Sequence, residues 1–346
     1  MIEILSAGTL STVQDLGRTG YRRYGVGTAG AMDRLALQVG NFMLGNAPDA
    51  AGIEVPVLPF QVRFLADMAF AVTGADAAAN LDGVELPPWW MRVALAGQIL
   101  TLGSKGPGFR LGARSYLLIA GGIAVPMVLG SRSTQMRGQF GGYLGRTLQR
   151  GDMLCSTCDR LTPQPDPGKP ASRSMHGFGV VPAAIALPQE AYVTSPEPEP
   201  AAVTAVRVLP AAEYEDFDPP STQAFWGSRW KISAQSDRYG YRLSGVQLDL
   251  REPIETRSHG IVPGVIQVPP GGQPIIQMRD AQPSGGYPKI GTVIEADLWR
   301  LGQARTGSHI RFVPTTYEQA VAALQPVDAY LSKVRQLTHL YRDMHV

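Results

Sequence analysis

Cysteine, excess charge and long hydrophobic runs are all scarce in this chain. Its 346 residues include two cysteines, and 31 Lys and Arg against 29 Asp and Glu give a formal net charge of +2. Two cysteines cannot build a disulfide framework, so nothing indicates an oxidising compartment. A near-neutral balance gives no electrostatic basis for binding nucleic acid or a membrane. The longest apolar run, from Tyr116, is interrupted by glycine and proline, and the N-terminal residues have no apolar signal core. We therefore expect a cytoplasmic protein.

Metal and nucleotide motifs are scarce as well. Cys155 and Cys158 form a C-x-x-C, but no second such pair and no H-x-x-x-H accompany them, so we predict no metal site. A P-loop ending in Gly-Lys-Ser/Thr is also missing. Gly25, Gly27 and Gly30 have the G-x-G-x-x-G spacing of a dinucleotide site, yet arginines precede them where a buried parallel strand must lie. We interpret this stretch as a glycine-rich turn that enters a helix.

Turn residues, by contrast, are abundant, with 39 glycines and 28 prolines. Between them, short segments alternate or group apolar residues in the manner of strands, as in VRFLADMAFAV, GQILTLG, AVRVLP and GVQLDL. Asp82-Gly83, between two such runs, predicts a hairpin. Short strands separated by frequent turns favour barrels or sandwiches over alternating β-α units. We therefore predict a mainly β fold.

Helices are predicted in two places. Apolar residues recur with a period near 3.6 over 32–44, and Thr315 with Glu318 fits a capping box that opens a second helical region. Pro326 must break or kink this C-terminal helix, which either packs on its own domain or contacts another subunit. Proline-rich stretches predict linkers or exposed loops between two β regions. We divide the chain into a β domain (1–161), a linker (162–202), a β-barrel domain (203–314) and a helical tail (315–346).

The densest group of polar residues set among glycines and prolines lies between Ser258 and Trp299. Its chemistry-bearing members within ten positions are Asp280, Gln282, Ser284, Tyr287 and Lys289. Such groups can bind and polarise a small amide or carboxylate, with Asp280 as proton acceptor or orienting group and Lys289 as anion holder. The same residues also suit an ordinary turn, because Asp, Ser and Gly-Gly form turns and lysine is commonly solvated.

Three further clusters have similar ambiguity. Asp15 either caps a turn or pairs with Arg18 near a ligand, and residues 131–134, with Arg132, fit an oxyanion or phosphate contact. Arg238 lies in SDRYGYRLSG, which suits either a contact or a turn packed by its aromatic side chains.

Four parts of the chain carry a resemblance to a known family. The first two read TVQDLGRTGYRRYGV from Thr12 and RSYLLIAGGIAVPMVLGSRST from Arg114. The third combines RVLPAAEYEDF from Arg207 with SDRYGYRLSG from Ser236, and the fourth reads SHGIVPGVIQVPPGGQPIIQMRDAQPSGGYPKIGTVIEADL from Ser258. Together they closely resemble the biotin-dependent carboxyltransferase family, also called allophanate hydrolase subunit 2, and the resemblance implies subdomains C and D of the carboxyltransferase domain. The resemblance covers nearly the whole chain, from Val13 to Phe312.

This resemblance implies two β-barrel-like domains of cyclophilin type with a few helices, including a C-terminal one. It implies one component of an ATP-dependent 5-oxoprolinase, in which 5-oxo-L-proline is opened to L-glutamate with ATP hydrolysis. The implied partners are subunits A and B of that enzyme, with a protein similar to the second of these as the direct one, and ATP acts at the level of the complex. No biotin attachment segment of Met-Lys-Met type is present.

Two alternatives remain open within the family. One is a carboxyltransferase or hydrolase component that acts on urea, allophanate or another amide. The other is a non-catalytic regulatory subunit that antagonises a kinase inhibitor. A polar loop suited to a lactam also suits urea, so the residues themselves do not choose between these substrates.

Residue roles are predicted from chemistry. The loop residues and three neighbours are expected to form one surface, composed of Asp280, Gln282, Ser284, Tyr287, Lys289, Ser258, His259 and Gln267. We predict Asp280, Lys289 and Gln282 as catalytic: Lys289 and nearby backbone N–H groups hold the lactam carbonyl while Asp280 orients water. The others are predicted to bind substrate, together with Arg132, Asp15 and Arg18.

Overall fold

The computed structural model describes residues 1–103, 112–158, 177–187 and 203–345. The described residues form two compact units, each assembled from non-contiguous segments. Unit 1 comprises Met1–Arg18, Ala29–Leu187 and Asp328–Val346, and unit 2 comprises Thr19–Thr28 and Pro188–Val327. Of the predicted linker 162–202, only residues 177–187 lie within the described residues; they contain β12 (Phe178–Gly179) and α2 (Ala183–Ala186).

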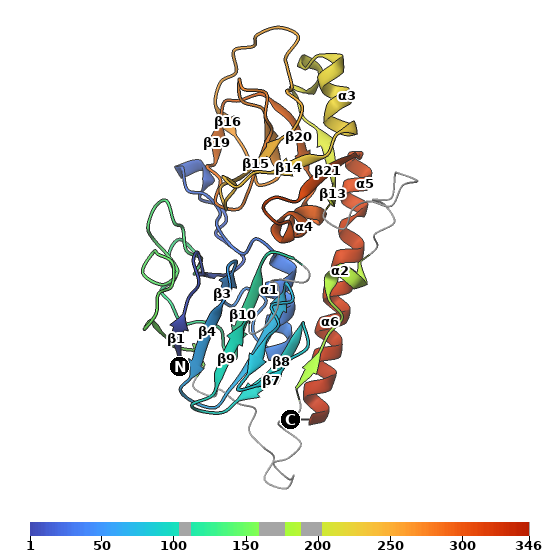
Figure 1. Cartoon of the computed structure of the whole chain (residues 1–346). Helices are drawn as coiled ribbons and strands as arrows, with labels where there is room; N and C mark the ends of the chain where they lie inside the picture. The colour runs from blue at the N-terminus through green and yellow to red at the C-terminus, as the bar shows by residue number, and fades with distance from the viewer. Residues whose placement is uncertain (104–111, 159–176, 188–202, 346) are drawn as a thin grey trace. The chain divides into compact units, whose positions relative to one another are not determined.

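Among its described residues, unit 1 holds two antiparallel sheets of six strands each (Figure 1). The first has the order β11 (Met153–Leu154), β1 (Ile2–Ser6), β4 (Phe60–Phe64), β9 (Ile99–Leu102), β6 (Asn80–Leu81) and β7 (Val84–Glu85). The second has the order β12, β8 (Trp90–Ala94), β5 (Met68–Gly74), β10 (Ser115–Ile119), β3 (Gly52–Val55) and β2 (Thr12–Gln14). Leu81 pairs with Val84, and both Asp82 and Gly83 have positive φ, so the predicted hairpin is confirmed.

The core of unit 1 forms between these sheets. Phe64 on β4 and Phe70 on β5 face each other with ring centroids 5.0 Å apart. β4 buries alternate residues, as a strand with one covered face does, whereas β10 is buried at every residue. The reason is helix α1 (Arg34–Leu44), which covers the other face of the second sheet. Gly40 permits this approach, since a Cβ there would lie 2.5 Å from the Leu118 side chain.

Helix α1 is capped at both ends. The Asp33 carboxylate accepts a hydrogen bond from Ala36 N (3.0 Å), and Gly45 at the C-cap adopts a left-handed conformation with φ of 69°. The helix starts two residues later than predicted because Asp33 is the cap. Residues Arg22–Tyr24 before the glycines form a 3-10 helix, η1, and not the buried strand that a dinucleotide site requires, so the predicted absence of that strand is confirmed.

Unit 2 is built around a closed barrel. Among its described residues the strand order is β13 (Val203–Pro210), β20 (Lys289–Val293), β17 (Val265–Gln267), β18 (Ile275–Gln277), β15 (Gly240–Ser244), β14 (Trp230–Ile232) and β21 (His309–Pro314). The β13–β21 pair is parallel and the other pairs are antiparallel. Phe225 and Phe312 stack in its core with ring centroids 4.6 Å apart.

Smaller elements decorate the barrel. They are the ribbon of β16 (His259–Gly260) and β19 (Ser284–Gly285), the 3-10 helices η4 (Tyr214–Asp216) and η5 (Glu295–Asp297), and helices α3 (Pro219–Gly227) and α4 (Leu298–Gln303). The strands and the few helices of both units confirm the predicted mainly β fold.

Helices α5 (Tyr317–Ala322) and α6 (Leu324–His345) form the tail (Figure 1). The capping box uses Thr316 and Gln319, so the predicted box at Thr315 and Glu318 was wrong by one residue. Both frames begin with threonine and end with Glu or Gln, and only the backbone geometry separates them. Pro326 lies in the first turn of α6, where its missing N–H costs nothing, so the chain breaks before it. No helix within the described ranges is long and apolar enough to cross a membrane.

Candidate functional site

The candidate site lies on the barrel of unit 2, where β17 pairs with both β18 and β20. Ile266 and Ile276 are fully buried and alternate along their strands with Gln267 and Gln277, so the two amides leave the opposite face of the sheet. A β-bulge between Ile266 and Gln267 places Gln267 opposite Lys289. Bulges re-aim side chains and often lie beside active sites.

The two glutamine amides are buried and hydrogen-bonded in series. Gln277 Nε2 donates to Gln267 Oε1 (3.0 Å), and Gln267 Nε2 donates to the carbonyl oxygen of Tyr287 (3.3 Å). The backbone of β19 lies against this relay, because a Cβ on Gly285 would be 2.6 Å from Gln267 Nε2. Glycine at 285 therefore permits the close approach, and the relay fixes the orientation of both amides.

Lys289 is the most unusual group of the site. It is 5% exposed, and its Nζ lies 3.7 Å from Glu213 Oε1, beyond hydrogen-bond distance. Within the described residues, neither Lys289 Nζ nor Glu213 Oε2 has a hydrogen-bond partner. A buried ion pair is normally supported by additional hydrogen bonds, since desolvation of both charges is costly. This pair therefore keeps ammonium donors and a carboxylate acceptor available to a polar ligand.

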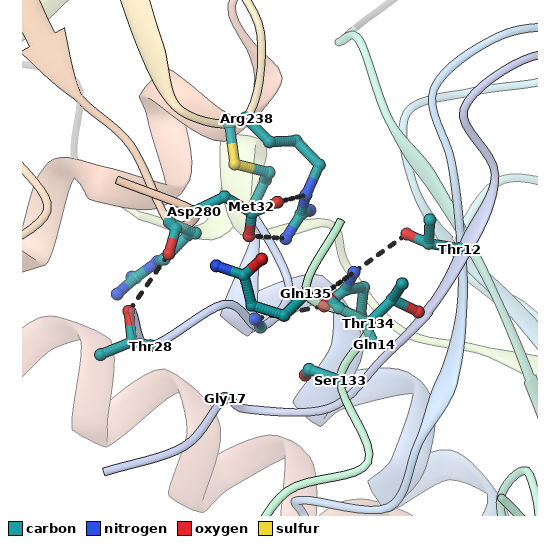
Figure 2. Close-up of polar contacts among 12 residues, drawn as sticks. Thr12, Gln14, Gly17, Thr28, Met32, Ser133, Thr134, Gln135, Arg238 and Asp280 are labelled. Atoms are coloured by element: carbon teal, nitrogen blue, oxygen red, sulfur yellow. Dashed lines mark hydrogen bonds and ion pairs between the residues drawn. The ribbon is translucent and has the colours of Figure 1, made fainter. Parts of the chain in front are cut away.

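Asp280 is held in a two-point ion pair. Arg238 donates from Nε to Oδ2 (3.0 Å) and from Nη2 to Oδ1 (2.9 Å), and the Asp280 backbone N–H donates to the Arg238 carbonyl oxygen (2.8 Å) (Figure 2). Asp280 is 1% exposed. Because both of its oxygens accept from a guanidinium, this carboxylate is a poor proton acceptor. Of its two predicted roles, the geometry favours the orienting one.

The remaining predicted residues of unit 2 are exposed. They are Gln282, Ser284, Tyr287, Ser258 and His259. The ribbon brings several of them together, because His259 pairs with Gly285 and Gly260 pairs with Ser284. A Cβ on Gly286 would lie 3.1 Å from Ser258 Oγ, so Ser258 borders the same turn. The structure thus brings Ser258, His259 and Ser284 together around the turn at Gly285 and Gly286, whose Gly285 borders the Gln267 amide, and no such contact is seen for Gln282 among the described residues.

Asp15, Arg18 and Arg132 belong to unit 1, where the side chains of Asp15 and Arg18 fasten the loop that contains Arg132 to the segment after strand β2. The buried Asp15 carboxylate accepts from Ser131 Oγ (2.7 Å), from Arg132 N (2.5 Å) and from Gly17 N (2.7 Å). Arg18 is 1% exposed and donates from Nη2 to the Ser133 carbonyl oxygen (2.7 Å). These contacts indicate a structural role for Asp15 and Arg18. The Ser131 hydroxyl already donates to Asp15, so it is not available to bind the oxyanion that this loop was predicted to contact.

Gln14 extends this fastening. Its Nε2 donates to Thr12 Oγ1 (2.9 Å) and its Oε1 accepts from Gly30 N (3.1 Å) (Figure 2).

An open hollow of about 770 Å³ also lies in unit 1, lined by residues 5–10 and 147–150, and none of the predicted site residues lines it. Among the residues that the structure describes, no group of three His, Cys, Asp or Glu side chains is placed to hold a metal ion.

Sequence reasoning missed Glu213 and Gln277 as members of the site. Gln277 had a signal, because VIQV and IIQM place a glutamine at the same point of two short strands that can pair. Glu213 lies in a stretch that resembles the family, but nothing local linked it to Lys289, since the two are far apart in the chain and only the barrel brings them together. Arg238 was recognised as a possible contact and Asp280 as a catalytic residue, but the ion pair between them was not predicted.

The chain belongs to the family of the carboxyltransferase domain, subdomain A and B, whose model matches residues 24–314. This finding confirms the family resemblance, but the predicted subdomains C and D were wrong, because the matching model describes subdomains A and B. Two relatives are named as the C component of 5-oxoprolinase. The one from Haemophilus influenzae is 39% identical over 97% of this chain and 98% of its own length, and the one from Escherichia coli is 40% identical over 98% and 99%.

A solved structure shares the fold. The urea amidolyase of K. lactis is 28% identical with a TM-score of 0.78, and the match covers 95% of this chain. The match covers only 20% of that protein, so this chain spans about a fifth of the urea amidolyase.

Proposed function

We propose that this chain is one subunit of a heteromeric, ATP-dependent 5-oxoprolinase that opens 5-oxo-L-proline to L-glutamate. The observation that carries the proposal is the end-to-end correspondence with two bacterial relatives of that name, at 39% and 40% identity. Because each match covers nearly the whole of both chains, it favours the interpretation that this chain and its relatives are the same subunit, and not that they only share one domain.

In this proposal the polar face of the barrel binds the lactam. Lys289 Nζ donates to the carbonyl oxygen and stabilises the negative charge that grows on it during ring opening. Burial strengthens this interaction, because Lys289 is only 5% exposed and little water screens it. The Gln267–Gln277 relay forms the wall of the site, and Asp280 acts as a positioning residue through Arg238.

ATP and the partner subunits act at the level of the complex. Ring opening adds one water across the lactam C–N bond, and ATP hydrolysis makes the overall change favourable. We assign the partners as subunits A and B, with a protein similar to the second of these in direct contact with this chain. Support comes from the relatives' names, which describe one subunit of a larger enzyme.

The proposal predicts that ATP-dependent glutamate release from 5-oxo-L-proline requires this chain. The measurement mixes the chain with subunits A and B and then omits each component in turn. We expect release only from the full mixture, because the reaction is shared among the three. Equal release without this chain contradicts the proposal and favours the regulatory alternative.

A second candidate substrate is urea or a related amide, since a urea amidolyase shares the fold. The same mixtures, supplied with urea and ATP in place of 5-oxo-L-proline, separate the two. Turnover of urea without turnover of the lactam favours this second candidate.

A further inference from the structure

We infer that Lys289 and Glu213 form a donor–acceptor pair that recognises both polar groups on one edge of a lactam. In this arrangement the ring carbonyl oxygen accepts from Lys289 Nζ, and the adjacent ring N–H donates to the Glu213 carboxylate. The inference rests on the proposed function and deepens it, because it makes Glu213 a specificity-determining residue.

The distance between the two charges supports this inference. A separation of 3.7 Å between Lys289 Nζ and Glu213 Oε1 is too long for a hydrogen bond, yet two neighbouring atoms of one small group can contact both charges. The side chains are 7% and 15% exposed, so the pair is largely desolvated and most open on the glutamate side. Within the described residues Lys289 Nζ and Glu213 Oε2 have no hydrogen-bond partner. They match the carbonyl oxygen and the N–H of a lactam, which lie on the same side of its amide bond.

Secondary structure holds both residues in place before any ligand binds. Lys289 is the first residue of β20, and Glu213 directly precedes η4. Ala211 N donates to the Ile290 carbonyl oxygen (3.3 Å), which ties the two segments together beside the pair. Trp226 Nε1 donates to Tyr214 Oη (2.8 Å) and anchors the turn that carries Glu213. Such preorganisation favours specific recognition, because little order is lost on binding.

The pair also defines which ligands it rejects. A lactone has a ring oxygen in place of the N–H, so it would bring an acceptor against the Glu213 carboxylate and leave that charge buried without a donor. Sites that hydrogen-bond a substrate N–H discriminate strongly against analogues that lack it. A purely structural ion pair, by contrast, would not distinguish a lactam from a lactone.

The test compares binding of 5-oxo-L-proline with binding of its lactone counterpart, 5-oxotetrahydrofuran-2-carboxylate, by calorimetry on the full chain and on the assembled complex. We expect the unaltered protein to prefer the lactam by about tenfold to a hundredfold, as for a hydrogen bond to a charged group. Glu213→Gln should reduce this preference to a few-fold, because the amide can donate to the ring oxygen. Glu215→Gln, the same change at an exposed neighbour, should leave the preference intact.

A second variant tests the other half of the pair. Lys289→Met should weaken lactam and lactone binding alike, by about tenfold or more, since both ligands have a carbonyl. Lys231→Met, at an exposed lysine of β14, is its control. Thermal unfolding checks that each variant is folded, and Glu213→Gln, which keeps size and shape, remains informative if Lys289→Met does not fold.

The outcomes separate this inference from the proposed function. If the complex releases glutamate and Glu213→Gln keeps the full lactam preference, the inference is overturned and the function stands. If the complex releases no glutamate but the chain shows a Glu213-dependent lactam preference, the inference stands and the function falls. Binding of neither ligand by the unaltered protein also overturns the inference.

Discussion

Individual side chains of the candidate site differ in what their neighbours allow them to do. The opposite charges of Lys289 and Glu213 lie near each other, but within the described residues Lys289 Nζ and Glu213 Oε2 form no hydrogen bond. Both carboxylate oxygens of Asp280, by contrast, accept hydrogen bonds from Arg238. Two carboxylates of one unit therefore have different uses. Glu213 can accept from a ligand, and Asp280 holds a guanidinium.

The ion pair of Asp280 leads to a prediction about stability. Asp280→Ala should lower the free energy of unfolding by about 3 kcal/mol or more, because it removes the carboxylate that compensates a largely buried guanidinium. Chemical denaturation measures the loss, and Asp249→Ala, at an exposed carboxylate of the same unit, is the control. An Asp280→Ala protein of unchanged stability that has lost all turnover would instead support a direct catalytic role.

At the scale of elements, α1 illustrates how local capping and tertiary contacts cooperate. Asp33 N donates to Tyr116 Oη (2.8 Å), and Tyr116 Oη donates to Glu54 Oε2 (2.7 Å). Burial, reinforced by the Glu54 and Asp33 carboxylates, raises the pKa of Tyr116 well above its usual value. The phenol therefore stays protonated, and β10 and β3 hold the first turn of α1 through it.

The cap itself is testable. Asp33→Ala should lower the free energy of unfolding by about 1 kcal/mol, because the Ala36 N–H loses its acceptor. Asp33→Asn keeps an acceptor of the same geometry and should cost much less. Urea denaturation of both variants measures the difference. If the asparagine variant is as unstable as the alanine variant, the charge of Asp33 and not its capping bond is what stabilises the helix.

At the scale of the whole molecule, the N-terminal and C-terminal segments of the chain belong to the same unit. Residues of α6 from Asp328 onward belong to unit 1. Tyr330 Oη donates to the Val181 carbonyl oxygen (2.8 Å), and the rings of Tyr341 and Phe178 have centroids 4.3 Å apart. We predicted that the tail packs either on its own domain or on another subunit; these contacts support packing within the chain, in unit 1.

This arrangement predicts that a change in α6 destabilises unit 1 selectively. Val334 is 6% exposed, so Val334→Asp buries a charge and should cost about 3 kcal/mol, whereas Lys333→Asp at the exposed neighbouring position should cost little. Hydrogen exchange locates the effect. We expect faster exchange in α1 and β12 with unchanged exchange in β17 and β20. Equal acceleration in both units would show that they unfold together.

The sequence by itself determined the features that depend on near neighbours. Alternation of apolar residues indicated strands, Asp82-Gly83 indicated its hairpin, and apolar periodicity over 32–44 indicated a helix close to the observed α1. The family resemblance also came from the sequence. Local hydrogen bonds and side-chain periodicity cause these features, and both can be read from residues a few positions apart.

Only the tertiary structure decided what the polar residues can do. Arg238 and Asp280 are 42 positions apart, and their pairing favours the orienting role over the proton-acceptor role that the sequence left equally open for Asp280. Glu213 meets Lys289 because the antiparallel pairing of β13 with β20 brings the end of β13 beside the start of β20. The physical reason is that the chemistry of a charged group depends on its burial and its partners, and distant segments supply both.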